Sequence, residues 1–182
     1  MAKLPKPTFQ AMEDAYRTDP TSVHDCPRLY SKDTGDITLG GQHLNTCAIR
    51  FTEGLSIALG LVKNRSDITK LTKGGGDGRS FLLGPYGYKA KLCPHGIGRG
   101  ASDVAYFLVE QWGNPTHTFK APGEVPKGIK DLTGAVSFIK IPGYSGQGHM
   151  DIWHPEGCLG SREGHDHHYY WSSEKVFFWK LE

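Results

Sequence analysis

Cys47 stands where a protein chain could hold a reactive thiol. It lies in the segment 45–59, NTCAIRFTEGLSIAL, in which apolar residues recur at the spacing of one helix face. Backbone N–H groups at a helix start have no partner within the helix and favour negative charge, so a thiolate is favoured there. That position suits a nucleophile. The alternative is that Cys47 is a small buried apolar residue, which is the ordinary role of a lone cysteine.

His149 is the candidate for the base that such a thiol needs. It enters a predicted strand after a glycine-rich turn, SGQGHMDIW at 145–153, so its ring can lie at the end of a sheet. The glycines at 146 and 148 would let another backbone approach that ring. The chain has nine histidines, and any one of them is ordinarily a surface or hydrogen-bonded core residue. The glycine context favours His149 over the others.

Two carboxylates could accept a hydrogen bond from the far ring nitrogen of His149 and so orient it. Asp151 lies two residues along the same strand face, so we expect its side chain to stand beside the ring and to position or contact another group. Asp166 comes from a neighbouring segment and can approach the ring from behind. The sequence therefore favours Asp166 as the third member.

The other motifs do not indicate a cofactor. Residues 165–168, HDHH, are adjacent in sequence, and adjacent loop residues seldom converge on one metal ion. The glycines of 71–88 lack the lysine and the spacing of a phosphate loop and instead predict a hairpin-like turn. Cys26, Cys93 and Cys158 form no CxxC pair and no zinc spacing. We expect no metal and no cofactor.

Two helices are predicted in the first third of the chain. The first follows the cap Thr8 and stops before Pro20. The second begins at Cys47, buries an apolar face and turns Arg50, Glu53 and Ser56 away from it.

A third helix and a set of strands follow. Ser102 is predicted to cap the helix, which ends at the Gly-Asn-Pro of 113–115. Short β-branched and aromatic runs then appear at 134–141, 148–153 and 174–182, separated by glycine and proline turns. Helices first and strands later predict an α+β fold with an antiparallel β-sheet, in one domain spanning 1–182.

Composition excludes several classes of protein. A hydrophobic content of 37%, a charged content of 22% and a formal net charge of +2 are ordinary for a globular protein. They give little support to a nucleic-acid surface. No run of about 18 apolar residues could span a bilayer, and the first residues, MAKLPKPTFQ, hold no apolar signal core. We expect a protein made in the cytoplasm without a signal peptide, with no nucleic-acid or membrane partner.

The order of these motifs resembles a known family. Cysteine at a helix head, then Gly-His at a strand start, then an aspartate resembles the papain-like cysteine amidases of the NlpC type. The motifs NTCAIR, GHMDIW and KVFFWKL, with the helix ASDVAYFLVEQWGNP, look like family 4 of the type VI secretion amidase effectors. The resemblance runs from about Phe9 to the C-terminus. It implies a papain-like NlpC-type fold with the nucleophile helix packed on the antiparallel sheet.

The resemblance also implies roles for residues. Cys47 matches the family's nucleophile and His149 matches its base. The family's aspartate follows a cysteine after the Gly-His strand and precedes a Tyr-aromatic pair. Counted forward from Cys158 that place falls near Gly160, and counted back from the tyrosines at 169–170 it falls on Asp166. Supposing an insertion at 161–165 assigns the role to Asp166. In some members a second cysteine near the tyrosine pair can bridge to the position of Cys158; here Cys158 is free or paired elsewhere, with Cys26 as one candidate.

An oxyanion needs donors as well. The Cys47 backbone N–H is one candidate, and Gln42 or Asn45 of the preceding loop is the second. For Asn45 or Thr46 the alternative role is to cap the helix.

The function implied is that of an antibacterial toxin. It would hydrolyse the amide between the D-glutamate side-chain carboxyl and meso-diaminopimelate in peptidoglycan peptide stems. It would be delivered by the type VI secretion apparatus into the periplasm of a competitor and neutralised in its producer by an immunity protein. The alternatives are an autolysin or phage-type wall amidase, and a non-catalytic wall-binding domain of the same fold.

Overall fold

The strands of the C-terminal part of the chain, residues 117–180, form a five-stranded antiparallel sheet. The computed structural model describes residues 2–16, 47–70, 82–89, 97–98, 100–144, 148–161 and 168–182. The strands are β1 (His117–Phe119), β2 (Gly134–Ile139), β3 (Gly148–His154), β4 (Gly157–Cys158) and β5 (Lys175–Lys180), in the spatial order β1-β5-β2-β3-β4. All four neighbouring pairs are antiparallel. The predicted α+β class and its antiparallel sheet are confirmed.

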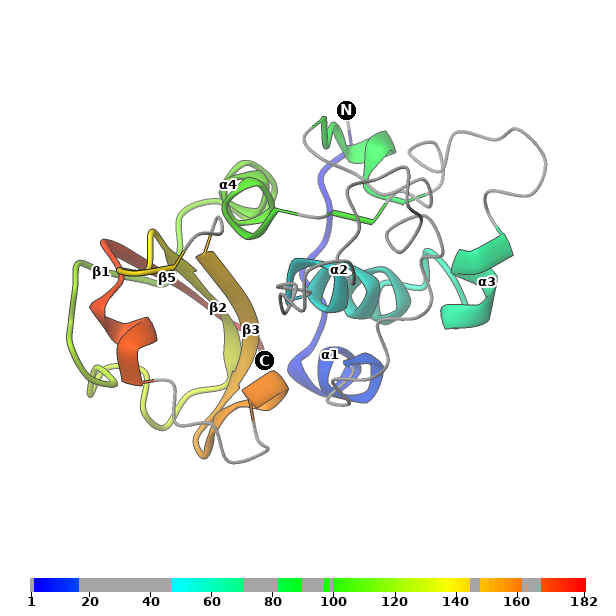
Figure 1. Ribbon diagram of the computed structural model, residues 1–182. Helices are drawn as coiled ribbons and strands as arrows, with labels where there is room; N and C mark the ends of the chain where they lie inside the picture. The colour runs from blue at the N-terminus through cyan, green and yellow to red at the C-terminus, as the bar shows by residue number, and fades with distance from the viewer. Residues whose placement is uncertain are drawn as a thin grey trace, which may run out of the picture.

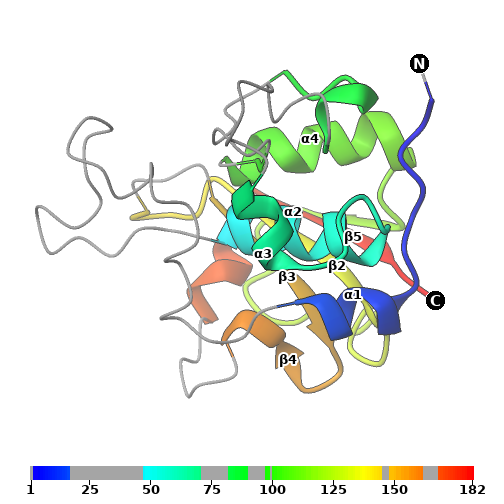
Figure 2. The same cartoon turned by 90° about the vertical axis from the view of Figure 1, so that its right-hand side faces the viewer.

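Three helices cover one face of this sheet: α1 (Phe9–Ala15), α2 (Cys47–Ala58) and α4 (Ala101–Trp112). The short α3 (Arg65–Lys70) lies on the side of α2 away from the sheet (Figure 1). Figure 1 shows α2 beside β3 with α1 below it and α4 above, and Figure 2 shows α2 running across the sheet between α4 and α1. The helix that begins at Cys47 is thus packed on the sheet as predicted. Among the helices of the described segments, none combines the length and apolar character needed to cross a bilayer.

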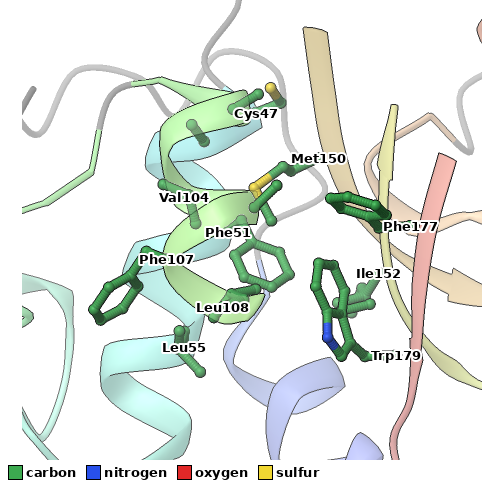
Figure 3. Close-up of a cluster of buried hydrophobic side chains, with 14 of the residues drawn as sticks. Cys47, Phe51, Leu55, Val104, Phe107, Leu108, Met150, Ile152, Phe177 and Trp179 are labelled. Atoms are coloured by element: carbon green, nitrogen blue, oxygen red, sulfur yellow. The ribbon is translucent and has the colours of Figure 1, made fainter. Parts of the chain in front are cut away.

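The main core lies between these helices and the sheet. Figure 3 shows Phe51 and Leu55 of α2 together with Val104 and Leu108 of α4, facing Met150, Ile152, Phe177 and Trp179 of the strands. A second cluster fills the other face of the sheet and includes Val136, Phe138, Trp153, Trp171 and Phe178. Because successive strand residues face opposite sides, β3 sends Met150 and Ile152 toward the helices and His149 and Asp151 the other way.

The two ends of the chain are tied to this core. Leu4 is 2% exposed, and its N–H donates to Gln111 Oε1 of α4 at 2.9 Å. The Phe9 N–H at the start of α1 donates to the Glu182 carbonyl at 2.7 Å. The first helix therefore packs where the last residues of the chain end.

Local predictions for α1 and α2 are partly right. Thr8 caps α1, because its hydroxyl accepts from the Ala11 N–H at 3.2 Å. The prediction that Glu53 and Ser56 face solvent is wrong, since they are 4% and 0% exposed.

The reason is a third apolar cluster that covers the outer side of α2. It is formed by Ile49, Val62, Ile68, Leu82 and Ile97. Under that cover the Glu53 carboxylate pairs with Arg65 Nε of α3 at 3.0 Å, and the Ser56 hydroxyl donates to the Thr52 carbonyl at 2.7 Å.

Two further local predictions differ from the structure. Gly100, without a side-chain cap, begins α4, so Ser102 lies in its first turn. Of the turn predicted over 71–88, the described part holds a short 3₁₀ helix at Gly84–Tyr86.

Candidate active site

Cys47 is the first residue of α2, where the helix approaches the start of β3. Its side chain is 5% exposed, and its Sγ lies 4.0 Å from the Gly148 carbonyl oxygen. The helix start is the position that the sequence predicts for it. Cys47 is therefore buried, as the structural alternative requires, but it is buried against a polar strand start that also carries His149.

Gly148 allows β3 to begin with this geometry. Its φ is +116°, a conformation that side chains other than glycine rarely adopt, and a Cβ there would lie 2.1 Å from the Phe138 carbonyl oxygen. The backbone that comes close to this glycine is thus the paired strand β2. Gly146, the other glycine of the motif, lies outside the described residues.

His149 lies within hydrogen-bond reach of the Cys47 side chain. Burial alone would lower the pKa of this histidine, but the thiolate of Cys47 and the Asp151 carboxylate raise it to about 9. Both groups do so through charge and through hydrogen bonds to the ring. The ring is 9% exposed, so water screens these interactions weakly. A thiol that hydrogen-bonds to an imidazole is the pairing that activates cysteine nucleophiles in enzymes.

Asp151 contacts the far side of the same ring. His149 Nε2 lies 3.2 Å from Asp151 Oδ2, and the carboxylate is fully buried. Since Asp151 takes Nε2, the ring nitrogen left for the thiol is Nδ1. The sequence predicted that Asp151 would contact another group, and this prediction is wrong. Residues two apart on one strand face are close enough for an aspartate to turn along the strand and reach a histidine ring.

Tyr170 closes the second side of the His149 ring. The two rings are stacked with centroids 4.4 Å apart and an interplanar angle of 24°. Burial raises the pKa of Tyr170, and the neighbouring Tyr169, Cys47 and Tyr144 raise it further, so its hydroxyl stays neutral. At the level of sequence, the Tyr169–Tyr170 pair served only as the reference point for locating the aspartate of the family motif. Its aromatic type next to a predicted catalytic segment was the signal that could have indicated this contact.

Tyr16 reaches the same group from the end of α1. It is 8% exposed, and burial raises its pKa, as do Asp151 and Cys47 beside it. Residues from α1, α2 and β3 thus meet at one point.

The remaining predicted site residues fall elsewhere. Gln42, Asn45 and Asp166 lie outside the described residues, as do Cys26 and Cys93. The HDHH motif lies there too, except for His168. Within the described segments no three histidine, cysteine or acidic side chains cluster as metal ligands would. What the described residues bring together is a thiol, an imidazole and a carboxylate in that order.

Comparison with known proteins identifies the fold. No protein-family model matches the chain, and no curated protein matches it. Solved structures do. The type VI effector Tae4 in its complex with the immunity protein Tai4 from Enterobacter cloacae matches with a TM-score of 0.60 at 16% identity, over 98% of this chain and 100% of that one.

Two further effector structures agree. Tae4 from the Salmonella Typhimurium complex Tae4-Tai4 gives a TM-score of 0.59 at 18% identity, over 98% of this chain and 100% of that one. Tae4 alone from Enterobacter cloacae gives 0.57 at 16%, over 100% of each chain. The chain has the fold of these type VI effectors along its whole length.

Proposed function

We propose that this chain is a cysteine amidase that cleaves peptide stems of peptidoglycan. Residues 1–182 act as a single amidase domain of the papain-like NlpC type. The observation that carries the proposal is the ordered contact of a helix-head thiol, a buried imidazole with a pKa of about 9 and a fully buried carboxylate. The resemblance to type VI amidase effectors and the shared fold with Tae4 agree with it.

The residues supply a complete mechanism for amide hydrolysis. The Cys47 thiolate attacks the carbonyl carbon, and the pair of electrons from the C=O bond moves to the oxygen. His149 holds the thiol proton on Nδ1 and gives it to the leaving amine as the C–N bond breaks. Water then attacks the thioester carbonyl while His149 takes one of its protons. The C–S bond breaks, so that the carboxylic acid product leaves and the Cys47 thiolate is restored beside the protonated His149.

The developing oxyanion requires donors at the head of α2. The first N–H groups of a helix have no partner within that helix, so the Cys47 N–H at the start of α2 is one candidate donor. Gln42 or Asn45 would supply the second donor from the preceding loop. Each such donor contributes about 100-fold or more to turnover in enzymes of this kind.

The substrate and the partners follow from the resemblance. The bond cleaved would be that between the D-glutamate side-chain carboxyl and meso-diaminopimelate. The type VI apparatus would deliver the protein to the periplasm of a competitor. Solved complexes of Tae4 with Tai4 support an immunity protein as the cognate partner. The alternative with the same chemistry is an autolysin or phage-type amidase.

Digestion of purified peptidoglycan tests the function. The native chain is expected to release fragments with a new diaminopimelate amine, seen by mass spectrometry. Cys47→Ala should lose activity by about 10⁴-fold or more, because it removes the nucleophile. Cys158→Ala is the matched control, since burial raises the pKa of that thiol and keeps it protonated. Turnover of Gln42→Ala and Asn45→Ala in the same assay tests the oxyanion donors.

Two results would contradict this proposal. Absence of a new amine with the native chain would favour a non-catalytic wall-binding domain. Equal cleavage by the native chain and Cys47→Ala would remove Cys47 from the mechanism.

A further inference from the structure

We propose that Asp151 is the carboxylate that orients His149, and that residue 160 is glycine because the Asp151 carboxylate fills the space of its side chain. Asp151 would be a positioning residue, acting on the substrate through His149. The inference rests on the proposed function, because orienting a histidine matters only where that histidine moves a proton. It replaces the sequence prediction of Asp166 for this role.

The Asp151 carboxylate is held in one orientation. Its Oδ1 accepts from the Ile152 N–H at 2.8 Å and from the Gly160 N–H at 2.9 Å, which leaves Oδ2 for His149 Nε2 at 3.2 Å. A fully buried carboxylate without hydrogen-bond partners would be costly; these three contacts and a hydrogen bond from the Tyr16 hydroxyl supply them. Two fixed donors on one oxygen also prevent the group from rotating.

Gly160 leaves the room that this carboxylate occupies. A Cβ at residue 160 would lie 2.8 Å from Asp151 Oδ2, 3.2 Å from Oδ1 and 3.3 Å from Cγ. Carbon and oxygen atoms without a hydrogen bond do not approach to 2.8 Å without displacement. Gly160 is not among the glycines with positive φ, so its backbone does not require glycine. The contact with Asp151 is the constraint.

An acidic side chain at residue 151 or at residue 160 would therefore place its carboxylate in the same space. A carboxylate on residue 160 would be built from a Cβ that already lies within 3 Å of the oxygen that contacts His149. The chain can carry an acid at either residue, but it has no space for both. The family motif, counted forward from Cys158, places its aspartate near Gly160. The presence of Asp151 explains why this chain has a glycine there instead.

Asp151→Asn would reverse the hydrogen bond to His149. The Ile152 and Gly160 N–H groups require an oxygen at Oδ1, so the new NH₂ would face Nε2. Nε2 would then have to accept, and the ring proton would sit on Nδ1. In that tautomer Nδ1 cannot take the thiol proton, the effect that makes such a replacement costly in catalytic triads.

The first test compares isosteric variants of acids. Asp151→Asn is expected to lower kcat at least about 100-fold and to lower the pKa of His149, because it removes a charge that raises it. Glu156→Gln, on the exposed turn after β3, should leave both unchanged. The His149 titration is followed by NMR of its ring protons, assigned by their loss in His149→Gln.

The second test exchanges the two positions. Gly160→Asp should lower turnover in the native background, because the new side chain collides with Asp151. In the background of Asp151→Ala the same Gly160→Asp change should raise turnover at least about 10-fold, because it restores a carboxylate beside Nε2. Gly160→Ala should lower turnover without lowering the thermal midpoint of unfolding by more than a few degrees.

Specific results would overturn the inference. One is an Asp166→Asn variant that lowers the His149 pKa and kcat while Asp151→Asn leaves both native. Another is Gly160→Asp lowering turnover equally in both backgrounds. The NMR titration needs no substrate, so it separates this inference from the proposed function. If the native chain leaves peptidoglycan intact but Asp151→Asn lowers the His149 pKa, the proposed function is wrong and the orienting contact between Asp151 and His149 is supported.

Discussion

At the scale of residues, sequence context identified Cys47 and His149, and the structure brings them into contact. Each had a local signal: a helix start for the thiol and a glycine turn for the histidine. Asp151 had none, because spacing along a strand gives the face of a side chain but not the direction in which it turns. The sequence did not reveal that the Asp151 carboxylate is buried. A fully buried carboxylate needs hydrogen-bond donors, and Asp151 finds two backbone N–H groups, the His149 ring and the Tyr16 hydroxyl.

The pH dependence of activity belongs to this scale. The pKa of His149 is raised from 6.5 to about 9, so the imidazolium persists below about pH 9 and is lost above it. In the proposed mechanism that proton goes to the leaving amine, so kcat/KM is expected to fall as pH rises through about 9. Steady-state kinetics from pH 6 to 10 measures this alkaline limb.

A substitution checks the cause of the shift. The Cys47 thiolate raises the pKa of His149, so the histidine of Cys47→Ala should titrate at lower pH than in the native chain. An unchanged NMR titration in that variant would mean that the thiol and the ring do not form an ion pair.

At the scale of elements, the longer helices and strands could be predicted from the sequence and the shortest ones could not. The strands at β2, β3 and β5 and the helices α2 and α4 carry enough residues for their apolar period to be read. The missed elements are short: α3 has six residues, β1 three and β4 two. Such segments owe their conformation to the partners that they pack against, and the buried polar side of α2 was missed for the same reason.

Gly148 is the residue on which the start of β3 depends. Gly148→Ala is expected to lower the free energy of unfolding by about 3 kcal/mol or more, because the new Cβ would meet the Phe138 carbonyl at 2.1 Å and φ is +116°. Gly143→Ala is the matched control. Its φ is +75° but nothing lies within 4 Å of its Cβ, so strain of about 1 kcal/mol is expected. Urea denaturation of both variants gives the comparison; equal losses would exclude the collision.

At the scale of the whole molecule, the order of helices and strands predicted the α+β class, and the type VI effector structures share it. The way the chain ends fasten to the core could not be predicted, because it depends on contacts between residues more than 100 positions apart. These contacts bring the N-terminal segment, α1 and α4 into one core with α2.

A substitution at Leu4 tests whether the cooperative core includes the N-terminal segment. Leu4→Ala is expected to lower the free energy of unfolding by about 3 kcal/mol, as for other buried leucines. Lys6→Ala, two residues on and exposed, should change it by less than about 0.5 kcal/mol. Chemical denaturation measures both. A Leu4→Ala effect as small as that of Lys6→Ala would mean that the first residues do not take part in the cooperative unit.

The shared space of residues 151 and 160 has a consequence for how proteins of this fold diverge. A lineage that moves its aspartate from one position to the other passes through a chain with two colliding acids or with none, and both intermediates lose catalytic power. The exchange therefore requires two linked changes. Among proteins of this fold, an aspartate two residues after the histidine that matches His149 should occur together with a glycine at the position of Gly160, a covariation that sequencing of relatives would reveal or refute.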